Sequence, residues 1–194
     1  MTGPTDAPPS RRQQDVQRNI DALLAAATEV FASDGVDAPV RRIIARAGVG
    51  AGTFYRYFPE RSDLITAVFR HEVDACVETA AALAEQHEPV EALARWLRHV
   101  GRFVADKRGL KPAMHSGEPA YRSLPAYFLD RFTPALAQLL DAAAAAGEIR
   151  TDISPDDLLR AVSGIVTPDD DAFTDRMIAL LVDGLRHRPS ATAP

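Results

Sequence analysis

The segment from Val40 to Arg61 gathers the side chains that could bind a polyanion. It holds five arginines and one acid, Glu60, whereas the whole chain of 194 residues has a net charge of −5. A short basic segment in an acidic chain is typical of a DNA-binding element attached to a body that does not bind DNA. The alternative interpretation is a charged surface that meets only solvent.

This segment is expected to form two short helices, at 40–47 and 51–58. Gly48, which follows the first, can take the left-handed conformation that ends a helix, and Pro59 follows the second. A longer helix, with an apolar stripe at 16–33, precedes them. The short helices and the glycine turn predict a helix-turn-helix unit.

The helix expected at 51–58 has distinct faces when each residue is advanced by about 100°. Phe54 and Phe58 share one face, which predicts that they anchor the helix in a core. The opposite face carries small, hydrogen-bonding or cationic groups: Gly52, Thr53 and Arg56. Phenols occupy the two flanks: Tyr55 and Tyr57. Such a helix presents hydrogen-bonding groups to base edges and hydroxyls to phosphates, although the same aromatic residues could simply form a core.

The rest of the chain is also expected to be helical. An apolar stripe that begins near Ser62 is too long for the small N-terminal unit, so we interpret it as a connector helix. Further helical stretches follow without an alternating strand pattern, which predicts an all-α fold of about eight or nine helices. The expected domains are a flexible N-terminal arm at 1–15, a helix-turn-helix DNA-binding domain at 16–61, a helical effector-binding and dimerisation domain at 62–188, and a tail at 189–194.

Residues 16 to 77 resemble the TetR family of bacterial transcriptional regulators. The resemblance rests on the runs “EVFASDG” and “APVRRIIARAGVGAGTFYRYFPERSDLITAV”. Family members are homodimers that bind palindromic operators with the N-terminal unit and a small effector with the C-terminal domain, usually as repressors. The resemblance implies that these residues contact double-stranded DNA: Arg41, Gly50, Ala51, Gly52, Thr53, Tyr55, Arg56, Tyr57 and Arg61.

Three positions depart from the family pattern. Gly50 stands where a serine commonly caps the recognition helix, and glycine is a slightly weaker cap. Ala51 replaces a residue that is often basic or polar, and its side chain cannot donate to a phosphate. Ile44 fills a site that is usually small and faces the recognition helix. Ala51 and Ile44 leave an alternative function open, an all-helical interaction or small-molecule-binding module with lost or weakened DNA binding.

The C-terminal half predicts an effector pocket between its central helices. Aromatic and polar side chains that could line it or orient a ligand are Trp96, His99, Phe103, Met114, Tyr121, Tyr127 and Phe128. Aromatic residues at helical spacing are more often ordinary core, which is the alternative interpretation. The last two helices carry apolar stripes with small residues such as Ala161 and Gly184. In the family these two helices form the homodimer interface.

Other classes of protein are not expected. The single cysteine, Cys76, excludes an intramolecular disulfide. His71 and Asp74 could share a helix face, but no third ligand joins them, so we expect no metal site and no cofactor. No catalytic constellation indicates an enzyme, and no apolar run reaches the roughly 18 to 20 residues of a membrane span. We expect a cytoplasmic repressor that a small-molecule effector releases from its operator.

Overall fold

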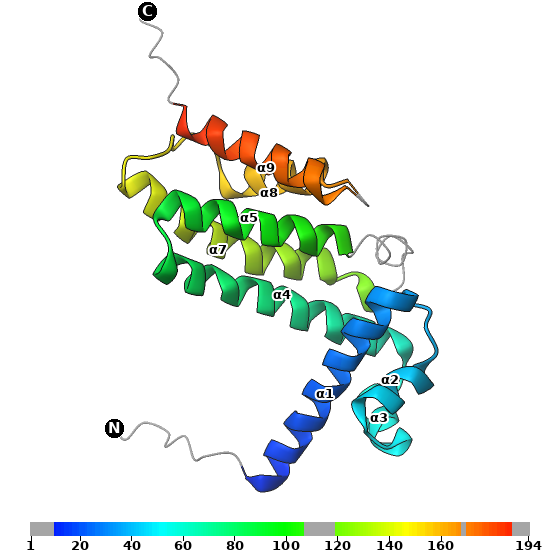
Figure 1. The fold of residues 1–194 in the computed structure, drawn as a ribbon. Coiled ribbons are helices and arrows are strands. Elements are labelled where there is room, and N and C mark those ends of the chain that lie inside the picture. Colours follow the sequence, from blue (N-terminus) through cyan, green and yellow to red (C-terminus); the bar gives the residue numbers. More distant parts are fainter. Residues whose placement is uncertain (1–9, 107–118, 168–169, 188–194) are drawn as a thin grey trace, which may run out of the picture. The chain divides into compact units, whose positions relative to one another are not determined.

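The computed structural model describes residues 10–106, 119–167 and 170–187. Every regular element in these ranges is a helix (Figure 1), which confirms the predicted all-α class. Met114, one of the predicted effector residues, lies outside the described ranges. Among the described residues, no helix is both long and apolar enough to cross a bilayer.

The chain forms two compact units, Met1–Val68 and Phe69–Pro194. The first unit contains three helices and the start of a fourth: α1 (Arg11–Asp34), α2 (Val40–Ala47), α3 (Ala51–Tyr57) and α4 (Arg61–Gln86). The boundary that we predicted between residues 61 and 62 lies at the start of α4. The contacts divide the chain further along the same helix, so α4 runs without interruption through the boundary between the units.

α1 begins earlier than its apolar stripe. The Ser10 hydroxyl accepts a hydrogen bond from the backbone N–H of Gln13, and the Gln13 side chain accepts one from the backbone N–H of Ser10. This capping box satisfies donors that the first turn leaves unpaired, so the polar residues from Arg11 onward are helical. We predicted a flexible arm at 1–15 and a buried apolar stripe from about Val16. Residues 11–15 are instead helical, which the apolar periodicity does not reveal because it follows only the buried part of a helix.

The core of the first unit uses one stripe of each helix. α1 contributes Leu23 and Ala27, α2 contributes Ile43 and α3 contributes Phe54, and none of these is more than 2% exposed. The start of α4 adds Leu64 to the same cluster. Burial of a large apolar side chain stabilises a fold by roughly 1.5 to 3 kcal/mol, so these contacts hold the two short helices in place.

In the second unit α5 is the central helix, because it packs against α7, α8 and α9 (Figure 1). The elements that follow α4 are α5 (Pro89–Asp106), the 3-10 turn η2 (Pro119–Tyr121), α7 (Leu124–Ala145), α8 (Pro155–Ile165) and α9 (Asp171–Arg186). Leu93, Trp96 and Val100 of α5 are completely buried. α5 and α9 approach closely at Gly101, where a Cβ atom would lie 3.0 Å from Cδ1 of Ile178.

Candidate nucleic-acid interface

α2 and α3 are joined by the glycine turn that the sequence predicts. Gly48 has φ 65° and ψ 23°, in the left-handed region, and ends α2. Gly50 is extended and precedes α3, with no side chain to cap the first turn. A residue with a Cβ atom would be strained in the left-handed region, so glycine at this position allows the chain to turn from α2 into α3 without that cost.

The two faces of α3 agree with the helical projection. Phe54 and Phe58 are 2% and 6% exposed and belong to the core of the first unit. Accessible or half-buried residues cover the rest of the helix: Gly52, Thr53, Tyr55 and Arg56. Apolar anchors on one side and hydrogen-bonding groups on the other are what insertion into a major groove requires.

Tyr57 holds Arg56 on the surface of α3. Nη2 of Arg56 donates a 2.9 Å hydrogen bond to the Tyr57 hydroxyl, and the guanidinium carbon lies 4.9 Å from the centre of the Tyr57 ring. Tyr57 is half-buried and packs against the core of the first unit. Arg56 is therefore positioned in advance, which reduces the side-chain entropy that it loses on meeting a ligand. We predicted both residues for the site but not their contact.

Two arginines of α2 are paired with acids of α1. Arg42 forms an ion pair with Asp34, and Arg46 forms one with Glu29. These acids lie outside the segment at 40–61, so the surface is less positive than the charge of that segment alone indicates. Both pairs are partly exposed to solvent, and such pairs contribute about 0 to 1 kcal/mol each.

Arg61 is bound to the loop between α1 and α2. Its Nε donates a 3.0 Å hydrogen bond to the carbonyl of Val36, and its Nη2 donates a 2.6 Å hydrogen bond to the carbonyl of Ala38. We predicted Arg61 as a phosphate contact from its place just after the recognition helix. The structure places these donors on carbonyls that precede it by 25 and 23 residues, a distance at which sequence patterns give no signal.

Arg41 has a different environment from the other arginines of α2. It is exposed, and it contacts no acid or carbonyl in the part of the chain that the structure describes. Arg56 also has no such acceptor there, because its guanidinium donates to the Tyr57 hydroxyl instead. Within the described residues, Arg41 and Arg56 are therefore the arginines of this segment whose guanidinium groups are not bound to an acid or a backbone carbonyl.

The departures at Ile44 and Ala51 have visible structural consequences. Ile44 is half-buried and packs against the core of the first unit, and Phe54 stays 2% exposed beside it in the same cluster. The core therefore accommodates the larger side chain without expelling its main anchor. Ala51 is exposed, and its side chain offers no hydrogen-bond donor at the start of α3.

The aromatic residues predicted to line an effector pocket pack largely against one another. Phe103 stacks on Phe128, and Trp96 packs on Phe132, with ring centres 5.9 Å and 5.5 Å apart. Trp96 is 0% exposed, and its Nε1 donates a 2.9 Å hydrogen bond to the carbonyl of Cys76. The structure therefore brings Trp96, Phe103 and Phe128 into one aromatic cluster in which Trp96 and Phe103 are buried.

The polar candidates for the effector pocket lie in different environments. Tyr121 is 5% exposed. His99 is exposed on α5, where partial desolvation and the charge of Arg102 lower its pKa. The structure therefore does not bring His99 into the buried aromatic cluster, because it lies on the solvent side of α5.

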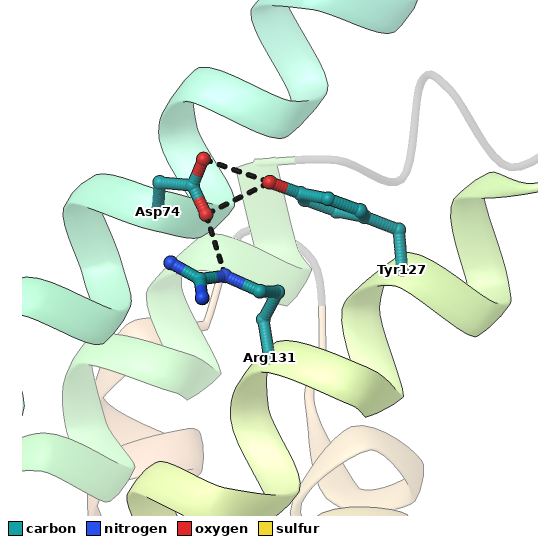
Figure 2. A network of polar contacts seen from close by, with 3 residues as sticks. All are labelled: Asp74, Tyr127 and Arg131. Atoms are coloured by element: carbon teal, nitrogen blue, oxygen red, sulfur yellow. Dashed lines mark hydrogen bonds and ion pairs between the residues drawn. The ribbon is translucent and has the colours of Figure 1, made fainter. Parts of the chain in front are cut away.

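Tyr127 is bound to an acid of α4 (Figure 2). Its hydroxyl donates to the Asp74 carboxylate, whose oxygens lie at 2.7 Å and 2.9 Å, and Nε of Arg131 donates to the same carboxylate at 2.8 Å. Burial and the hydrogen bond to Asp74 raise the pKa of Tyr127 above its ordinary value. We predicted Tyr127 as a pocket residue and did not foresee this network.

Cys76 is a structural thiol in the second unit. Burial raises its pKa to about 12, so its reactive thiolate form is scarce at neutral pH. Its carbonyl accepts hydrogen bonds from Trp96 and from the Thr79 hydroxyl. In the described ranges no group of three or more metal-ligating side chains is found.

These features define a class of protein. A short helix that is entered through a glycine turn, anchored by Phe54 and accessible along Tyr55 and Arg56 is a helix-turn-helix element. Residues 23–68 match the family model described as “Bacterial regulatory proteins, tetR family”, and residues 88–187 match the one described as “Transcriptional regulator SbtR-like, C-terminal domain”. The second match alone covers more than half of the chain. The protein belongs to the TetR family of transcriptional regulators.

Solved structures and curated relatives agree with this assignment. A TetR transcriptional regulator from Streptomyces coelicolor is 39% identical, with a TM-score of 0.74 over 88% of this chain and 99% of that one. A TetR regulator from Mycobacterium vanbaalenii is 32% identical, with a TM-score of 0.70 over 91% and 99%. A Staphylococcus aureus HTH-type transcriptional regulator is 25% identical over 57% of this chain, and the match spans only 60% of that relative.

The family assignment extends the resemblance that we based on residues 16 to 77. The match at 88–187 covers the second unit, in which we found no specific motif. Regulators of this family bind DNA and small-molecule ligands, typically as dimers, and are not enzymes. The site on α3 is therefore the candidate interface with DNA.

Proposed function

We propose that the protein is a ligand-responsive repressor that binds a palindromic operator as a homodimer and is released by a small-molecule effector. The observation that carries this proposal is the division of α3, with Phe54 and Phe58 buried and Tyr55 and Arg56 accessible. A recognition helix needs both properties, because it must be held rigidly while its outer face meets base edges and phosphates.

In this proposal, residues of α2, of α3 and of the turn between them contact the operator: Arg41, Gly50, Ala51, Gly52, Thr53, Tyr55, Arg56 and Tyr57. Thr53 and Tyr55 lie nearest the bases, and Arg41 binds a phosphate. Arg56 enters the interface already supported by the Tyr57 ring and hydroxyl. Arg61 acts indirectly, because its donors hold the carbonyls of the α1–α2 loop.

The proposed dimer interface is formed by α8 and α9. A groove of about 380 Å³ is lined there by apolar and small residues, including Ala161, Leu181 and Gly184. Leu180, beside them, is 64% exposed. Covering such a side chain against a second copy is favourable by roughly 25 cal/mol for each Å² of apolar surface removed from water. In this proposal residues 62–188 form the dimerisation and effector-binding domain.

The proposed effector site lies beside the aromatic cluster. A groove of about 280 Å³ is lined by Phe128, Leu129, Leu159 and Arg160, and Phe128 is also part of the cluster. A small aromatic molecule fits this combination of an aromatic wall and a hydrogen-bonding group. RolR, a protein with the same fold (21% identity, TM-score 0.54), was crystallised with the ligand resorcinol.

Binding to duplex DNA tests the central claim. Genomic fragments are selected with the purified full chain, and the affinity for the recovered operator is measured against salt. Log affinity should fall linearly with log salt, and Arg56→Ala should reduce the slope by about one because one phosphate contact is lost. Arg95→Ala is the matched control, since Arg95 is an exposed arginine of α5. A parent protein that recovers no common sequence and shows no salt-dependent binding refutes the proposal.

The oligomeric state tests the dimer interface separately. Leu180→Glu should convert the dimer to a monomer at micromolar concentration, because it places a charge in the proposed apolar contact. Leu129→Glu changes another exposed leucine, 47% exposed on α7, and should leave the dimer intact. Sedimentation measures both. If both variants, or neither, dissociate, the interface does not lie on α9 as proposed.

A further inference from the structure

The groove beside the aromatic cluster combines apolar walls with polar groups of both charges. It has a volume of about 280 Å³ and lies between α7 and α8, which pack against each other in the second unit. α7 contributes Phe128 and Leu129, and α8 contributes Leu159, which is 1% exposed and forms the floor. This volume lies just below the usual size of pockets for drug-sized ligands, so we expect a ligand with a single ring.

The apolar side of the groove is the part of the aromatic cluster that reaches the surface. Phe128 is half-buried, and its ring stacks on Phe132 with ring centres 4.3 Å apart and an interplanar angle of 24°. Phe132 is completely buried, whereas Phe128 also lines the groove. Leu129, next to it, is 47% exposed. A flat aromatic ring that covers both side chains continues the stack and removes apolar surface from water.

The polar side of the groove is one face of α8. Asp156, Arg160 and Ser163 recur at steps of four and three residues, which places them on the same side of the helix. Arg160 is exposed and Ser163 is half-buried, and within the described residues neither side chain is bound to an acid, a carbonyl or a hydroxyl. A guanidinium and a hydroxyl one turn apart together provide hydrogen-bond donors for a carboxylate.

Asp156 is the acidic member of this face and already has one partner. Its Oδ1 accepts a 2.7 Å hydrogen bond from the Thr133 hydroxyl of α7. Asp156 also lies in the first turn of α8, where the helix dipole stabilises a negative charge. An ionised carboxylate accepts more than one hydrogen bond, so Asp156 can take a further donor from a ligand. Because it repels a second negative charge, the carboxylate of a ligand belongs at the Arg160 end of the groove.

The separation of Asp156 and Arg160 sets the length of the ligand. Residues four apart in a helix are separated by roughly 6 Å along its axis. A carboxyl group and a hydroxyl group at opposite ends of one benzene ring are a similar distance apart. When the two groups are neighbours on the ring, they span a shorter distance and do not reach both side chains.

We propose that this groove binds an aromatic acid with a hydrogen-bond donor in the para position, a class represented by para-hydroxybenzoate. The carboxylate accepts hydrogen bonds from Arg160 and Ser163, the ring covers Phe128 and Leu129, and the para donor binds Asp156. This inference rests on the proposed function, because it names the chemical class of the effector. The groove shares no lining residue with the groove between α8 and α9, so the ligand and the proposed dimer contact use different side chains of α8.

Three ligands test the chemistry of the site by isothermal titration calorimetry of the purified full chain without DNA. Para-hydroxybenzoate has both polar groups, benzoate lacks the para donor, and para-hydroxybenzamide lacks the negative charge. We expect benzoate to bind about fivefold more weakly than para-hydroxybenzoate, and the amide about tenfold more weakly, because the lost hydrogen bonds involve charged groups. No saturable binding of para-hydroxybenzoate overturns the proposal, and so does benzoate or the amide binding as tightly.

A pair of arginine variants tests the carboxylate contact. Arg160→Gln and Arg176→Gln each remove one exposed arginine, but Arg176 lies on α9 and does not line the groove. Arg160→Gln should weaken binding of para-hydroxybenzoate by about tenfold and leave binding of the neutral amide within about twofold of the parent. Arg176→Gln should change neither. A loss of folded protein would weaken both ligands equally, so the contrast between ligands isolates the contact. Equal effects of the two variants on para-hydroxybenzoate overturn the proposal.

A pair of aspartate variants tests the other end of the groove. An amide at position 156 is a weaker acceptor and does not repel a carboxylate, so Asp156→Asn should reduce the preference for para-hydroxybenzoate over benzoate from about fivefold to less than about twofold. Asp157→Asn is the matched control, because Asp157 lies in the same first turn but lines the groove with α9 instead. It should keep the parent preference. An unchanged preference in Asp156→Asn overturns the proposal.

Operator binding separates this inference from the proposed function. If para-hydroxybenzoate binds with the expected dependence on Arg160 but leaves operator affinity unchanged, release by this ligand is refuted and the binding site stands. A parent chain that binds no duplex DNA refutes the proposed function, while calorimetry still decides the site. If the parent chain binds an operator but shows no saturable binding of para-hydroxybenzoate, the inference fails and DNA binding stands.

Discussion

The predicted functional residues on α3 of the first unit are accessible, whereas the aromatic residues predicted for a pocket in the second unit are largely buried. In the first unit, Phe54 lies buried beneath α3 while Tyr55 and Arg56 remain accessible. In the second unit, Trp96 and Phe103, which we predicted for a pocket, are buried among other aromatic rings. The difference teaches that an accessible binding surface depends on which face of a single helix is buried. A pocket depends instead on the volume that several helices leave unfilled between them.

The ion pairs and hydrogen bonds of the two units can be compared in the same way. In the first unit, acids of α1 pair with Arg42 and Arg46 and leave Arg41 without an acid partner among the described residues. In the second unit, Asp74 binds Tyr127 and Arg131 of another helix and ties two elements together. These ion pairs join two helices in each unit, α1 with α2 in the first and α4 with α7 in the second, but only those of the first unit occupy arginines of the segment at 40–61.

The largest effect is expected at the anchor of the recognition helix. Phe54→Ala should lower the free energy of unfolding by about 3 to 5 kcal/mol, because it empties a buried site in the small core of the first unit. Tyr55→Ala, next to it but 55% exposed, should change stability by about 0.5 kcal/mol or less and weaken operator binding instead. Denaturant unfolding and DNA titration check both. Similar losses of stability would contradict the division of α3 into a buried and an accessible face.

A pair of glycines sharpens the comparison between the units. A Cβ atom at Gly101 would lie 3.0 Å from Ile178 and 3.2 Å from Thr174, whereas one at Gly52 meets nothing within 4 Å. Replacing either helical glycine by alanine gives a similar gain in helix propensity, so the difference isolates the contact. We expect Gly101→Ala to be about 1 to 3 kcal/mol less stable than Gly52→Ala in thermal or denaturant unfolding. Equal stabilities would mean that α5 and α9 are not in close contact there.

Removing acids from α1 should strengthen DNA binding. Glu29→Gln and Asp34→Asn free Arg46 and Arg42, so each should raise operator affinity by about two- to fivefold and steepen the salt dependence. Asp21→Asn is the control, because Asp21 accepts a hydrogen bond from Gln17 rather than pairing with an arginine. Salt titrations of the three variants decide the question. If Asp21→Asn has the same effect as the other two, only total charge matters.

The smallest effect concerns pH and the exposed face of α5. The pKa of His99 is lowered in the folded chain, so the unfolded chain binds a proton more readily. Stability contributed by neutral His99 is therefore present above its ordinary pKa of 6.5 and is lost as the pH falls below that value. His99→Gln should lose less stability than the parent between neutral and mildly acidic pH. Parallel unfolding curves at all pH values would contradict the lowered pKa.

The sequence by itself determined the elements and the faces of the first unit. Apolar spacing and the glycines predicted the helices and the turn at Gly48, and the helical projection of 51–58 separated Phe54 from Arg56. These properties depend on neighbours within one or two helical turns. Local periodicity is therefore enough to predict them, apart from polar helix ends such as the start of α1 at Arg11.

Only the tertiary structure decided which charged side chains already have a hydrogen-bonding or ion-pair partner within the protein. Arg46 meets Glu29 across 17 residues, Arg61 meets the Val36 carbonyl across 25, and Asp74 meets Arg131 across 57. It also decided that Trp96 is core rather than an exposed pocket wall. The physical reason is that hydrogen bonds, ion pairs and unfilled volume depend on distances between elements, which the periodicity of a single helix does not contain.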